Sequence, residues 1–578
     1  TLNGQPVALW EQGEAVLRGF RSMYRLLCRH REELLAAGGP IAAFAGLPIR
    51  TLIRGTTAYA HLLHVAYHTD YLQSAVDRDR LFDRLWLDAV RYPPLRRAVR
   101  AERADLIRGD VPRFEARPES TDLLHPEGRI EGFFAEPGME LVRRRLRTLD
   151  ENDLERQAWL VRASIEATRP LDERQMWQRS PLPPPEPGPA EPGRFLAAAR
   201  SLGDRLAQLA IERDGVITWF HLDLTERGWL LEPMPVGLYN GLSGMALFFA
   251  HLREERYERL ARLALTSIRR RIEQEPGHIL RPGAYAGWGG IVYALTHLGR
   301  LWEEPELLAE AEGLAGFLAS RIETDDAYDL IAGSAGGIAA LLALHRHRPS
   351  ARVLDTARLG GERLLARAIV SKRGMAWPSL PGVSEIPLTG FSHGTAGIAW
   401  ALAGLATATG DERFRAAARE AIRYERSWFS PEHGSWPDLR ESRETGDGQA
   451  FFFAWCHGAP GIGLGRIACL PHLDDPEMID EIRIAARSTL AEGFGLNHSL
   501  CHGDLGNLEL VREAGLTAEA ERIAGGILAQ IEREGPRCGA SIHTEIPGLL
   551  TGLAGIGYGL LRAAYPERVP SVLLLETP

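Results

Sequence analysis

Seven copies of a Gly-x-x-Gly motif constrain the fold of this chain more than any other feature. The first glycines of the copies are Gly241, Gly287, Gly333, Gly394, Gly458, Gly503 and Gly552, so successive copies lie 46, 46, 61, 64, 45 and 49 residues apart. An apolar stretch follows each motif, as at 245–252, and an amphipathic stretch such as 257–274 precedes it. Each unit therefore predicts a helix, a loop with two glycines and a second helix.

Repeated helical units stack either as an open solenoid or as a closed α/α toroid. A solenoid needs polar capping repeats at its ends. The last copy instead runs apolar to near the C-terminus, as LLTGLAGIGYGLLRAAY at 549–565. We therefore expect a mainly all-α chain with a seven-repeat α/α toroid, a double α-barrel, at 194–578.

A proline-rich segment marks a domain boundary. Residues 180–193 read SPLPPPEPGPAEPG, with seven prolines in fourteen residues. Such a segment favours extended conformations and predicts a semi-rigid linker. It separates the repeats at 194–578 from residues 1–179, which have helical spacing of apolar residues at 9–35 and 139–167 and a turn-like stretch at 106–114.

Composition excludes several classes of protein. The formal net charge is −9, which argues against a basic nucleic-acid or membrane binder. Apolar runs are too short for a membrane span, and the N-terminal TLNGQPVALWEQGEA lacks the pattern of a secretory signal. Five scattered cysteines are not a disulfide framework, so we expect a cytoplasmic protein.

Chemistry-bearing residues occupy equivalent positions in the repeats. Immediately before the first glycine stand Asn240, Ala286, Ala332, His393, His457, His502 and Thr551. One position earlier stand Tyr239, Tyr285, Ile331, Ser392, Cys456, Cys501 and Leu550. In a closed ring these loop positions converge on one face. The two cysteines and the histidines that follow them are therefore expected to cluster.

Two thiols and an imidazole are a suitable ligand set for Zn²⁺, and three protein ligands leave a fourth position for a substrate. The alternative is a pair of buried thiols, each beside a hydrogen-bonded histidine. The register leaves the third ligand open between His457 and His502. Cys469 and Cys538 lie outside the loops and are expected to be packing residues.

His393 shares the loop register but has no adjacent cysteine, so it is a candidate acid–base residue. Asp329 lies four residues before Gly333 and is expected at the same rim. The alternatives are a histidine that is hydrogen-bonded within its loop and an aspartate that caps a helix.

These motifs resemble the lanthionine synthetase C-like cyclase family over about residues 195–578. The resemblance rests on FSHGTAG (391–397), WCHGAPGIG (455–463), NHSLCHGDLGN (497–507) and PGLLTGLAGIGYGLLR (547–562). It implies a toroid around a catalytic zinc bound by Cys456, Cys501 and His502, with His393 as general acid–base residue and Asp329 as its companion. Phe452 and His457 stand where some members carry arginine and tyrosine.

Residues 1–179 resemble the end of the dehydratase domain of class II, LanM-type, lanthipeptide synthetases. The resemblance rests on PIRTLIRGTTAYAHLL (48–63) and LIRGDVPRF (106–114), and the terminal SVLLLETP also fits such enzymes. It implies a role for Arg50 and Thr56 in phosphate elimination. The kinase-like region that would bind ATP and Mg²⁺ is not recognised here, so ATP and Mg²⁺ are not expected to bind this chain.

The resemblance implies a ribosomal precursor peptide, with a leader and a Ser/Thr/Cys-rich core, as the partner. The implied reaction is addition of peptide cysteine thiols to dehydroalanine or dehydrobutyrine, which forms (methyl)lanthionine rings. We expect this chain to cyclise a dehydrated peptide but not to dehydrate an unmodified one. The alternatives are another zinc-thiol transferase on the same toroid and a peptide-binding repeat module without chemistry.

Overall fold

The structure is a computed structural model of the chain. It describes residues 8–170, 179–182, 190–225, 228–378, 384, 386–440, 450–540 and 544–578. Residues 183–189 of the predicted proline-rich linker lie outside this set. The chain forms two compact units, Glu14–Ala158 and Thr1–Gly13 with Trp159–Pro578, and this division falls within a helix, α9 (Glu151–Glu166).

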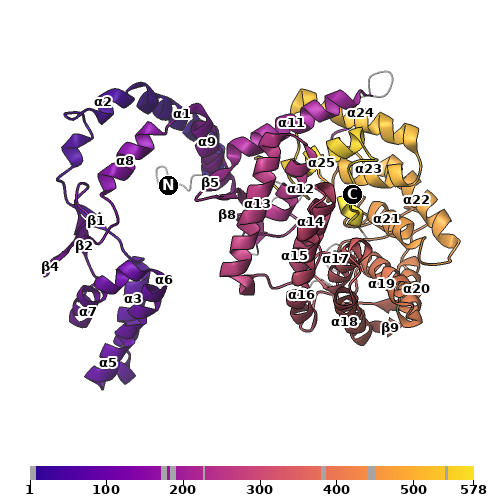
Figure 1. The fold of residues 1–578 in the computed structure, drawn as a ribbon, viewed down its shortest axis with the longest axis horizontal. Coiled ribbons are helices and arrows are strands. Elements are labelled where there is room, and N and C mark those ends of the chain that lie inside the picture. Colours follow the sequence, from indigo (N-terminus) through magenta and orange to yellow (C-terminus); the bar gives the residue numbers. More distant parts are fainter. Residues whose placement is uncertain are drawn as a thin grey trace. The chain divides into compact units, whose positions relative to one another are not determined.

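Seven helices of the described part form the inner ring of the larger unit (Figure 1). They are α12 (Leu242–His251), α14 (Trp288–Leu301), α17 (Ser334–His347), α19 (Thr395–Thr409), α21 (Ala459–Cys469), α23 (Asp504–Glu513) and α25 (Leu553–Ala564). Each begins directly at its Gly-x-x-Gly motif. Each contacts the next inner helix, and α25 contacts α12, so the ring is closed.

An outer layer surrounds this ring (Figure 1). Its helices are α13 (Glu255–Gln274), α15 (Pro305–Gly313) with α16 (Ala315–Ile322), α18 (Ala351–Arg367), α20 (Glu412–Arg426), α22 (Glu477–Glu492), α24 (Thr517–Glu534) and α11 (Pro192–Leu209). Each outer helix packs against the inner helix that precedes it in the chain, except α11, which packs against α25. The helix α11, which precedes every inner helix in the chain, thus completes the last repeat, and the predicted seven-repeat toroid is confirmed.

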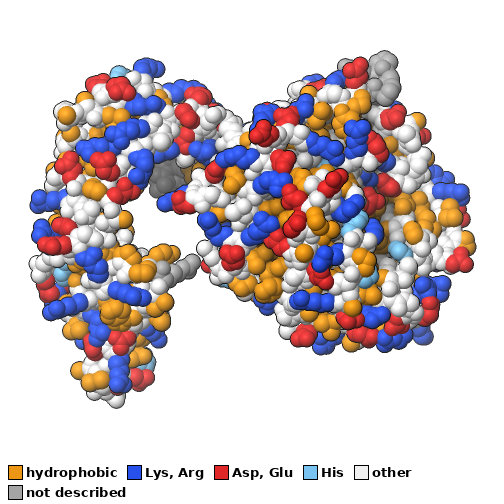
Figure 2. Space-filling view, viewed as in Figure 1, with side chains coloured by type: hydrophobic (Ala, Val, Ile, Leu, Met, Phe, Trp, Pro, Cys, Tyr) orange, Lys and Arg blue, Asp and Glu red, His pale blue; other side chains and the backbone are white. Residues whose placement is uncertain are grey.

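The sequence explains these two layers. All ten residues of α12 are buried, as expected for a helix that is apolar on every side. In α13 the buried residues lie on one side, and charged residues cover the other. Acidic and basic side chains are interspersed on the face shown in Figure 2. Among the described residues, no helix combines the length and apolar character that a bilayer span needs.

Short hairpins and the C-terminal segment complete the larger unit. The antiparallel hairpins are β5 (Ile211–Arg213) with β6 (Val216–Thr218), β7 (Phe220–Thr225) with β8 (Gly228–Pro233), and β9 (Ile369–Ser371) with β10 (Gly374–Ala376). The C-terminus lies near the centre of the ring (Figure 1). There the Tyr285 hydroxyl donates to the carbonyl oxygens of Val572 at 2.8 Å and Leu573 at 3.1 Å.

The Glu14–Ala158 unit is mostly helical with one small sheet. Its antiparallel strands are β1 (Ile49–Thr51), β2 (Phe114–Ala116), β3 (Leu123–His125) and β4 (Gly128–Ile130), in that order. Its helices are most of α1 (Gly13–Arg29), α2 (Arg31–Leu35), α3 (Thr56–Ala66), α4 (Thr69–Leu72), α5 (Ala75–Leu81), α6 (Leu85–Arg91), α7 (Val99–Arg108), α8 (Gly138–Arg147) and the first part of α9.

Two stretches of this unit show how local sequence sets helix ends. The helical spacing at 139–167 becomes two helices, because Asp150 accepts a hydrogen bond from the Asp153 backbone N–H at 2.7 Å and thereby caps the start of α9. The predicted turn at 106–114 is present. Gly109 ends α7 in the left-handed conformation, with φ of 87°, which glycine adopts without strain.

Candidate metal centre

Backbone hydrogen bonds join the seven loops that begin the inner helices into a closed circle. The N–H groups of Tyr239, Tyr285, Leu330, Ser392, Cys456, Cys501 and Leu550 donate, in that order, to the carbonyls of Tyr285, Ile331, Ser392, Cys456, Cys501, Leu550 and Tyr239. Apart from Leu330, which donates in place of its neighbour, every member is the residue two positions before a first glycine. Equivalent positions of the repeats therefore meet at one place.

Neighbouring loops of this circle bring two cysteines and a histidine together. The Cys456 and Cys501 sulfurs and one ring nitrogen of His502 lie within 4.8 Å of one another. Cys501 is buried, whereas Cys456 and His502 are partly exposed. The Nε2 atom of His502 lies 2.6 Å from the carbonyl oxygen of Gly539, which orients the ring. This cluster contains His502 and not His457.

A glycine-specific backbone shapes the loop that carries Cys456. Gly458 has a φ of 85°, whereas the first glycine of each other motif is extended. A Cβ atom at Gly458 would lie 1.9 Å from the carbonyl oxygen of Phe452. Any other residue at this position would therefore be strained and would displace the cysteine loop.

The two thiols differ in their electrostatic surroundings. Hydrogen bonding with Cys501 and burial raise the pKa of the Cys456 thiol well above its usual value. Hydrogen bonds from Cys456 and Tyr239, with the positive charge of Arg440, lower the pKa of Cys501 against the opposing effect of burial. Two adjacent thiols resist ionising together because their negative charges repel, so this donor set fits a divalent metal ion that would deprotonate both.

Residues that the sequence analysis did not assign surround the cluster. The Tyr239 hydroxyl donates to the Cys501 sulfur at 2.9 Å. Arg440 is held by Asp438, whose two carboxylate oxygens each accept from its Nε at 3.0 Å. Tyr239 occupies the same register position as the two cysteines, so the sequence could have predicted its place near them. Arg440 and Asp438 lie outside the repeated motifs, so the repeat pattern could not predict theirs.

His457 is buried beside this cluster. Burial and the positive charge of Arg440 lower its pKa to about 3, so the ring is neutral at pH 7. Its ring centre lies 6.2 Å from that of His393. The His457 ring thus lies close to His393, and its residue directly follows Cys456 in the chain.

That second group is a histidine–aspartate pair on the next two loops of the circle. The Nδ1 atom of His393 lies 2.6 Å from Oδ2 of Asp329. Asp329 is fully buried, and 22% of the His393 side chain is exposed. Because the carboxylate accepts the Nδ1 proton, Nε2 of His393 is the nitrogen left for proton exchange with a substrate.

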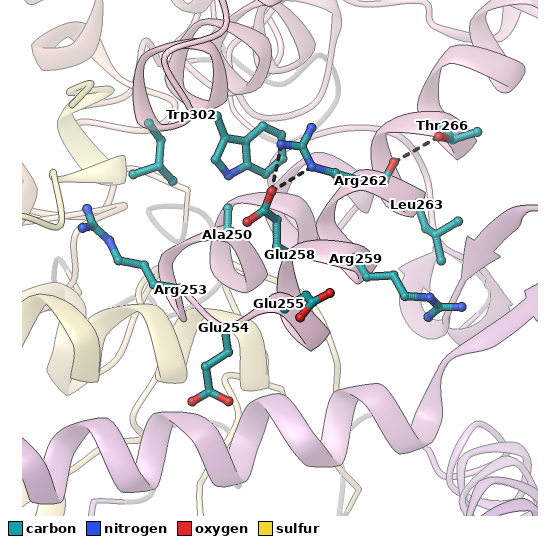
Figure 3. Close-up of a pocket in the computed structure, with 11 residues that line it drawn as sticks. Ala250, Arg253, Glu254, Glu255, Glu258, Arg259, Arg262, Leu263, Thr266 and Trp302 are labelled. Atoms are coloured by element: carbon teal, nitrogen blue, oxygen red, sulfur yellow. Dashed lines mark hydrogen bonds and ion pairs between the residues drawn. The ribbon is translucent and has the colours of Figure 1, made fainter.

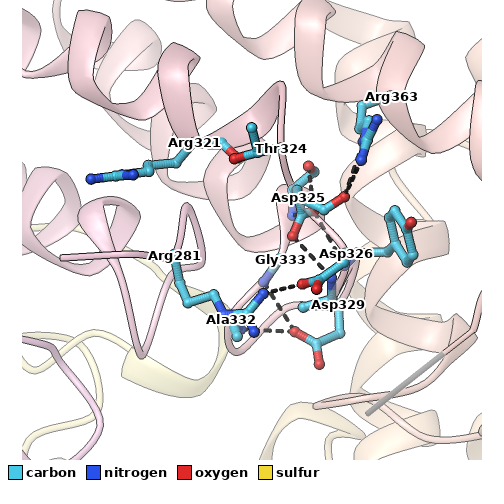
Figure 4. Close-up of polar contacts among 12 residues, drawn as sticks. Arg281, Arg321, Thr324, Asp325, Asp326, Asp329, Ala332, Gly333 and Arg363 are labelled. Atoms are coloured by element: carbon cyan, nitrogen blue, oxygen red, sulfur yellow. Dashed lines mark hydrogen bonds and ion pairs between the residues drawn. The ribbon is translucent and has the colours of Figure 1, made fainter. Parts of the chain in front are cut away.

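The Asp329 carboxylate is fixed by its own loop (Figure 4). Its Oδ1 accepts from the backbone N–H groups of Ala332 at 2.8 Å and Gly333 at 3.1 Å. The buried Asp325 accepts from the Ser334 N–H at 2.7 Å, and Arg363 donates to the Asp325 carbonyl at 3.0 Å. This loop thus holds the aspartate at one position relative to the histidine.

Arg50 and Thr56 belong to the Glu14–Ala158 unit, whereas the residues described above belong to the larger unit. Arg50 is exposed on β1, opposite Glu115 of β2. Thr56 is exposed at the first residue of α3. Arg54, which lies between them, is buried and donates from Nε to Glu102 at 2.6 Å.

A surface hollow on the outer layer has a different character (Figure 3). Its volume is about 690 Å³, and α13 and Trp302 line much of it. Arg262 donates to Glu258 at 2.9 Å and lies over the Trp302 ring. Neither Cys456 nor Cys501 lines the hollow.

Comparison with known proteins finds a family match for each of two regions of the chain. Residues 232–574 match the family described as lanthionine synthetase C-like protein, and residues 1–117 match a domain of unknown function, DUF4135. The lacticin 481/lactococcin biosynthesis protein LcnDR2 of Lactococcus lactis subsp. lactis is 22% identical over 590 residues, which cover 97% of this chain. The chain spans 60% of the length of that relative.

Two solved structures are also similar to the chain. Nisin cyclase is 19% identical with a TM-score of 0.49, and the match covers 66% of this chain and 97% of that one. A GH76 α-1,6-mannanase of Salegentibacter sp. HEL1_6 is 12% identical with a TM-score of 0.35, and the match covers 65% and 99%.

The family match covers more than half of the chain and includes Asp329, His393, Cys456, Cys501 and His502. The two matched regions, and the relative that aligns along nearly the whole chain, support the resemblance to class II, LanM-type, lanthipeptide synthetases. The chain therefore belongs to the lanthionine synthetase C-like family.

Proposed function

We propose that the larger unit is a zinc-dependent lanthionine cyclase. It would add cysteine thiols of a precursor peptide to dehydroalanine or dehydrobutyrine and form (methyl)lanthionine rings. The observation that carries this proposal is that two thiols and an imidazole lie within 4.8 Å of one another, next to a histidine–aspartate pair on the same circle of loops. Addition of a thiol to an alkene needs both parts: one that activates sulfur and one that transfers a proton.

Cys456, Cys501 and His502 would hold the zinc ion, with the fourth position left to the substrate. A zinc ion bound there would deprotonate the peptide thiol and keep its sulfur nucleophilic. The hydrogen bonds at His502 and Cys501 support this assignment, because ligands of a metal are oriented by such contacts.

His393 would transfer the proton. When the sulfur forms its bond to Cβ, the π electrons of the dehydro residue move into the adjacent carbonyl and give an enolate. His393 would deliver a proton from Nε2 to Cα, while Asp329 accepts from Nδ1 and stabilises the protonated ring. The proton lost by the thiol restores the imidazolium, so the cycle balances.

For the N-terminal region we propose a partial dehydratase. Residues 1–179 would be its C-terminal part, 180–193 the linker and 194–578 the cyclase. Exposure of Arg50 and Thr56 supports their proposed contact with the phosphate group of a phosphorylated Ser or Thr, because a large peptide substrate can reach both. Arginine suits a departing phosphate because it donates two hydrogen bonds in a fixed geometry.

The test is to offer the purified chain two forms of a Ser/Cys-containing precursor peptide. We expect the dehydrated form to lose free thiols at constant mass, which is the signature of ring closure. We expect the unmodified form to lose no water in the presence of ATP and Mg²⁺. Cys469→Ala is the matched control, since this thiol is buried in α21 outside the circle of loops.

Unchanged thiols in the dehydrated peptide, with zinc bound to the chain, would contradict the cyclase and favour a binding module or another thiol transferase. If the unmodified peptide lost about 18 Da per serine, the mass of one water, the chain would dehydrate the peptide by itself. That result would contradict the proposal of a partial dehydratase.

A further inference from the structure

Tyr239 contacts Cys501 across the junction between the first and last repeats of the ring. It lies in the loop before α12, in the first repeat, whereas Cys501 lies in the sixth. Their side chains nevertheless meet, with the hydroxyl oxygen 2.9 Å from the sulfur. They meet because Leu550 links their loops: its N–H donates to the Tyr239 carbonyl at 2.7 Å, and its carbonyl accepts from the Cys501 N–H at 2.9 Å.

The direction of this hydrogen bond follows from the two groups. A phenol keeps its proton at neutral pH, and a thiolate can only accept. In the protein with both cysteines deprotonated, Tyr239 would therefore donate to Cys501. A hydrogen bond from a neutral donor to an anion withdraws charge from the anion and weakens it as a nucleophile.

This bond bears on a selectivity problem that the proposed reaction poses. Up to three sulfurs would meet an alkene at this site, two from the protein and one from the peptide, and only the peptide sulfur must react. We propose that Tyr239 is a positioning residue whose hydrogen bond keeps Cys501 a metal ligand and suppresses its addition to the dehydro residue. This inference rests on the proposed function.

The chain provides a matched control. Tyr285 occupies the same register in the next repeat, but its hydroxyl donates to the backbone carbonyls of Val572 and Leu573 and not to sulfur. Tyr239→Phe and Tyr285→Phe therefore each remove one hydroxyl from the same circle of loops. Only the first removes a hydrogen bond to a thiolate.

The experiment uses the full chain loaded with Co²⁺, whose sulfur-to-metal charge-transfer bands report the charge on the thiolates. We expect wild type and Tyr285→Phe to share one band position. In Tyr239→Phe the band should move to lower energy at unchanged metal stoichiometry and with an unchanged melting profile.

The zinc-loaded proteins are then incubated with a dehydroalanine peptide that lacks cysteine. Covalent adduct at Cys501, measured by mass spectrometry, should rise about tenfold in Tyr239→Phe, the size expected from one hydrogen bond to a charged group.

The outcomes separate this inference from the proposed function. Cobalt bound to Tyr239→Phe with an unshifted band, or an unchanged Cys501 adduct, would overturn the role of Tyr239 while ring closure by wild type still stands. Failure of wild type to bind cobalt or zinc would overturn both. A shifted band that also appears in Tyr285→Phe would overturn the specificity of the contact.

Discussion

The loops of the ring and the segment around β1 both carry residues that the sequence analysis assigned to function. In the ring these residues are brought together, whereas around β1 they are exposed to solvent. In the ring, Cys456 and Cys501 are held side by side by backbone hydrogen bonds between equivalent positions. In the smaller unit Arg50 is exposed, whereas Arg54, four residues later, is buried against Glu102 and Asp88. Register within a repeat thus predicts which residues converge, and a single motif outside a repeat does not.

The largest effect should come from the acid–base residue of the ring. His393→Ala is expected to retain zinc but to slow ring closure by about 10²–10⁴-fold, the usual range for a general acid–base group. Single-turnover cyclisation of a dehydrated peptide and metal analysis of the same sample measure both quantities. His278→Ala, at an exposed histidine shortly after the end of α13, is the control. Near-normal cyclisation by His393→Ala would remove its proposed role.

The next effect sharpens the contrast between Arg54 and Arg50. Arg54→Met leaves the fully buried Glu102 without its ion pair and should destabilise the smaller unit by about 3–5 kcal/mol. Hydrogen exchange of α3 and α7 amides reports this locally, which matters because a chain of two units need not unfold in one step. Equal exchange rates in Arg54→Met and wild type would show that the buried pair does not stabilise this unit.

Acid should weaken the ring through a buried histidine pair. The Nε2 atoms of His297 and His251 lie 2.7 Å apart, and burial lowers the pKa of His297 to about 3. In the unfolded chain a histidine has a pKa of about 6.5, so between these values the unfolded state binds one more proton. Stability is therefore full above about pH 6.5 and falls as the pH decreases toward 3, by about 2 kcal/mol at pH 5.

Denaturant titrations at pH 7 and pH 5 measure this loss, with Trp fluorescence as the probe. His297→Gln should reduce the difference between the two pH values, because glutamine does not titrate. An equal difference in the variant and in wild type would assign the acid sensitivity to other groups.

The smallest effect should be that of Arg50 on stability. Arg50→Met changes an exposed side chain and is expected to shift the free energy of unfolding by about 0.5 kcal/mol or less. The same hydrogen-exchange measurement serves as the check. Destabilisation as large as that of Arg54→Met would mean that Arg50 is structural and would argue against its proposed role in phosphate elimination.

These differences show what the sequence could and could not predict. The repeat spacing and the apolar last copy predicted the closed ring, and the loop register predicted that Cys456 and Cys501 would meet. The loop register alone did not choose between His457 and His502, because both precede a first glycine; the family resemblance implied His502, and His502 is the histidine that lies with the two cysteines. Arg440 and Asp438 lie outside the repeats, so periodicity could not locate them.

The spacing of the motifs also did not predict which inner helix packs against which outer helix. The pattern of helix, loop and helix did not reveal that each inner helix packs on the outer helix after it, nor that α11 packs against α25. Such pairing depends on which amphipathic face fits which groove, and short stretches of similar apolar character do not encode it uniquely.

Zinc content of the purified chain and four variants tests the central claim most directly. We expect about one zinc per wild-type chain, as for a single three-ligand site. Cys456→Ala and Cys501→Ala should lose zinc and cyclisation together, His502→Ala should weaken zinc binding far more than His457→Ala, and all should retain the helical content of the ring. Stoichiometric zinc in both cysteine variants, or tighter binding in His502→Ala than in His457→Ala, would contradict the assignment of the metal centre.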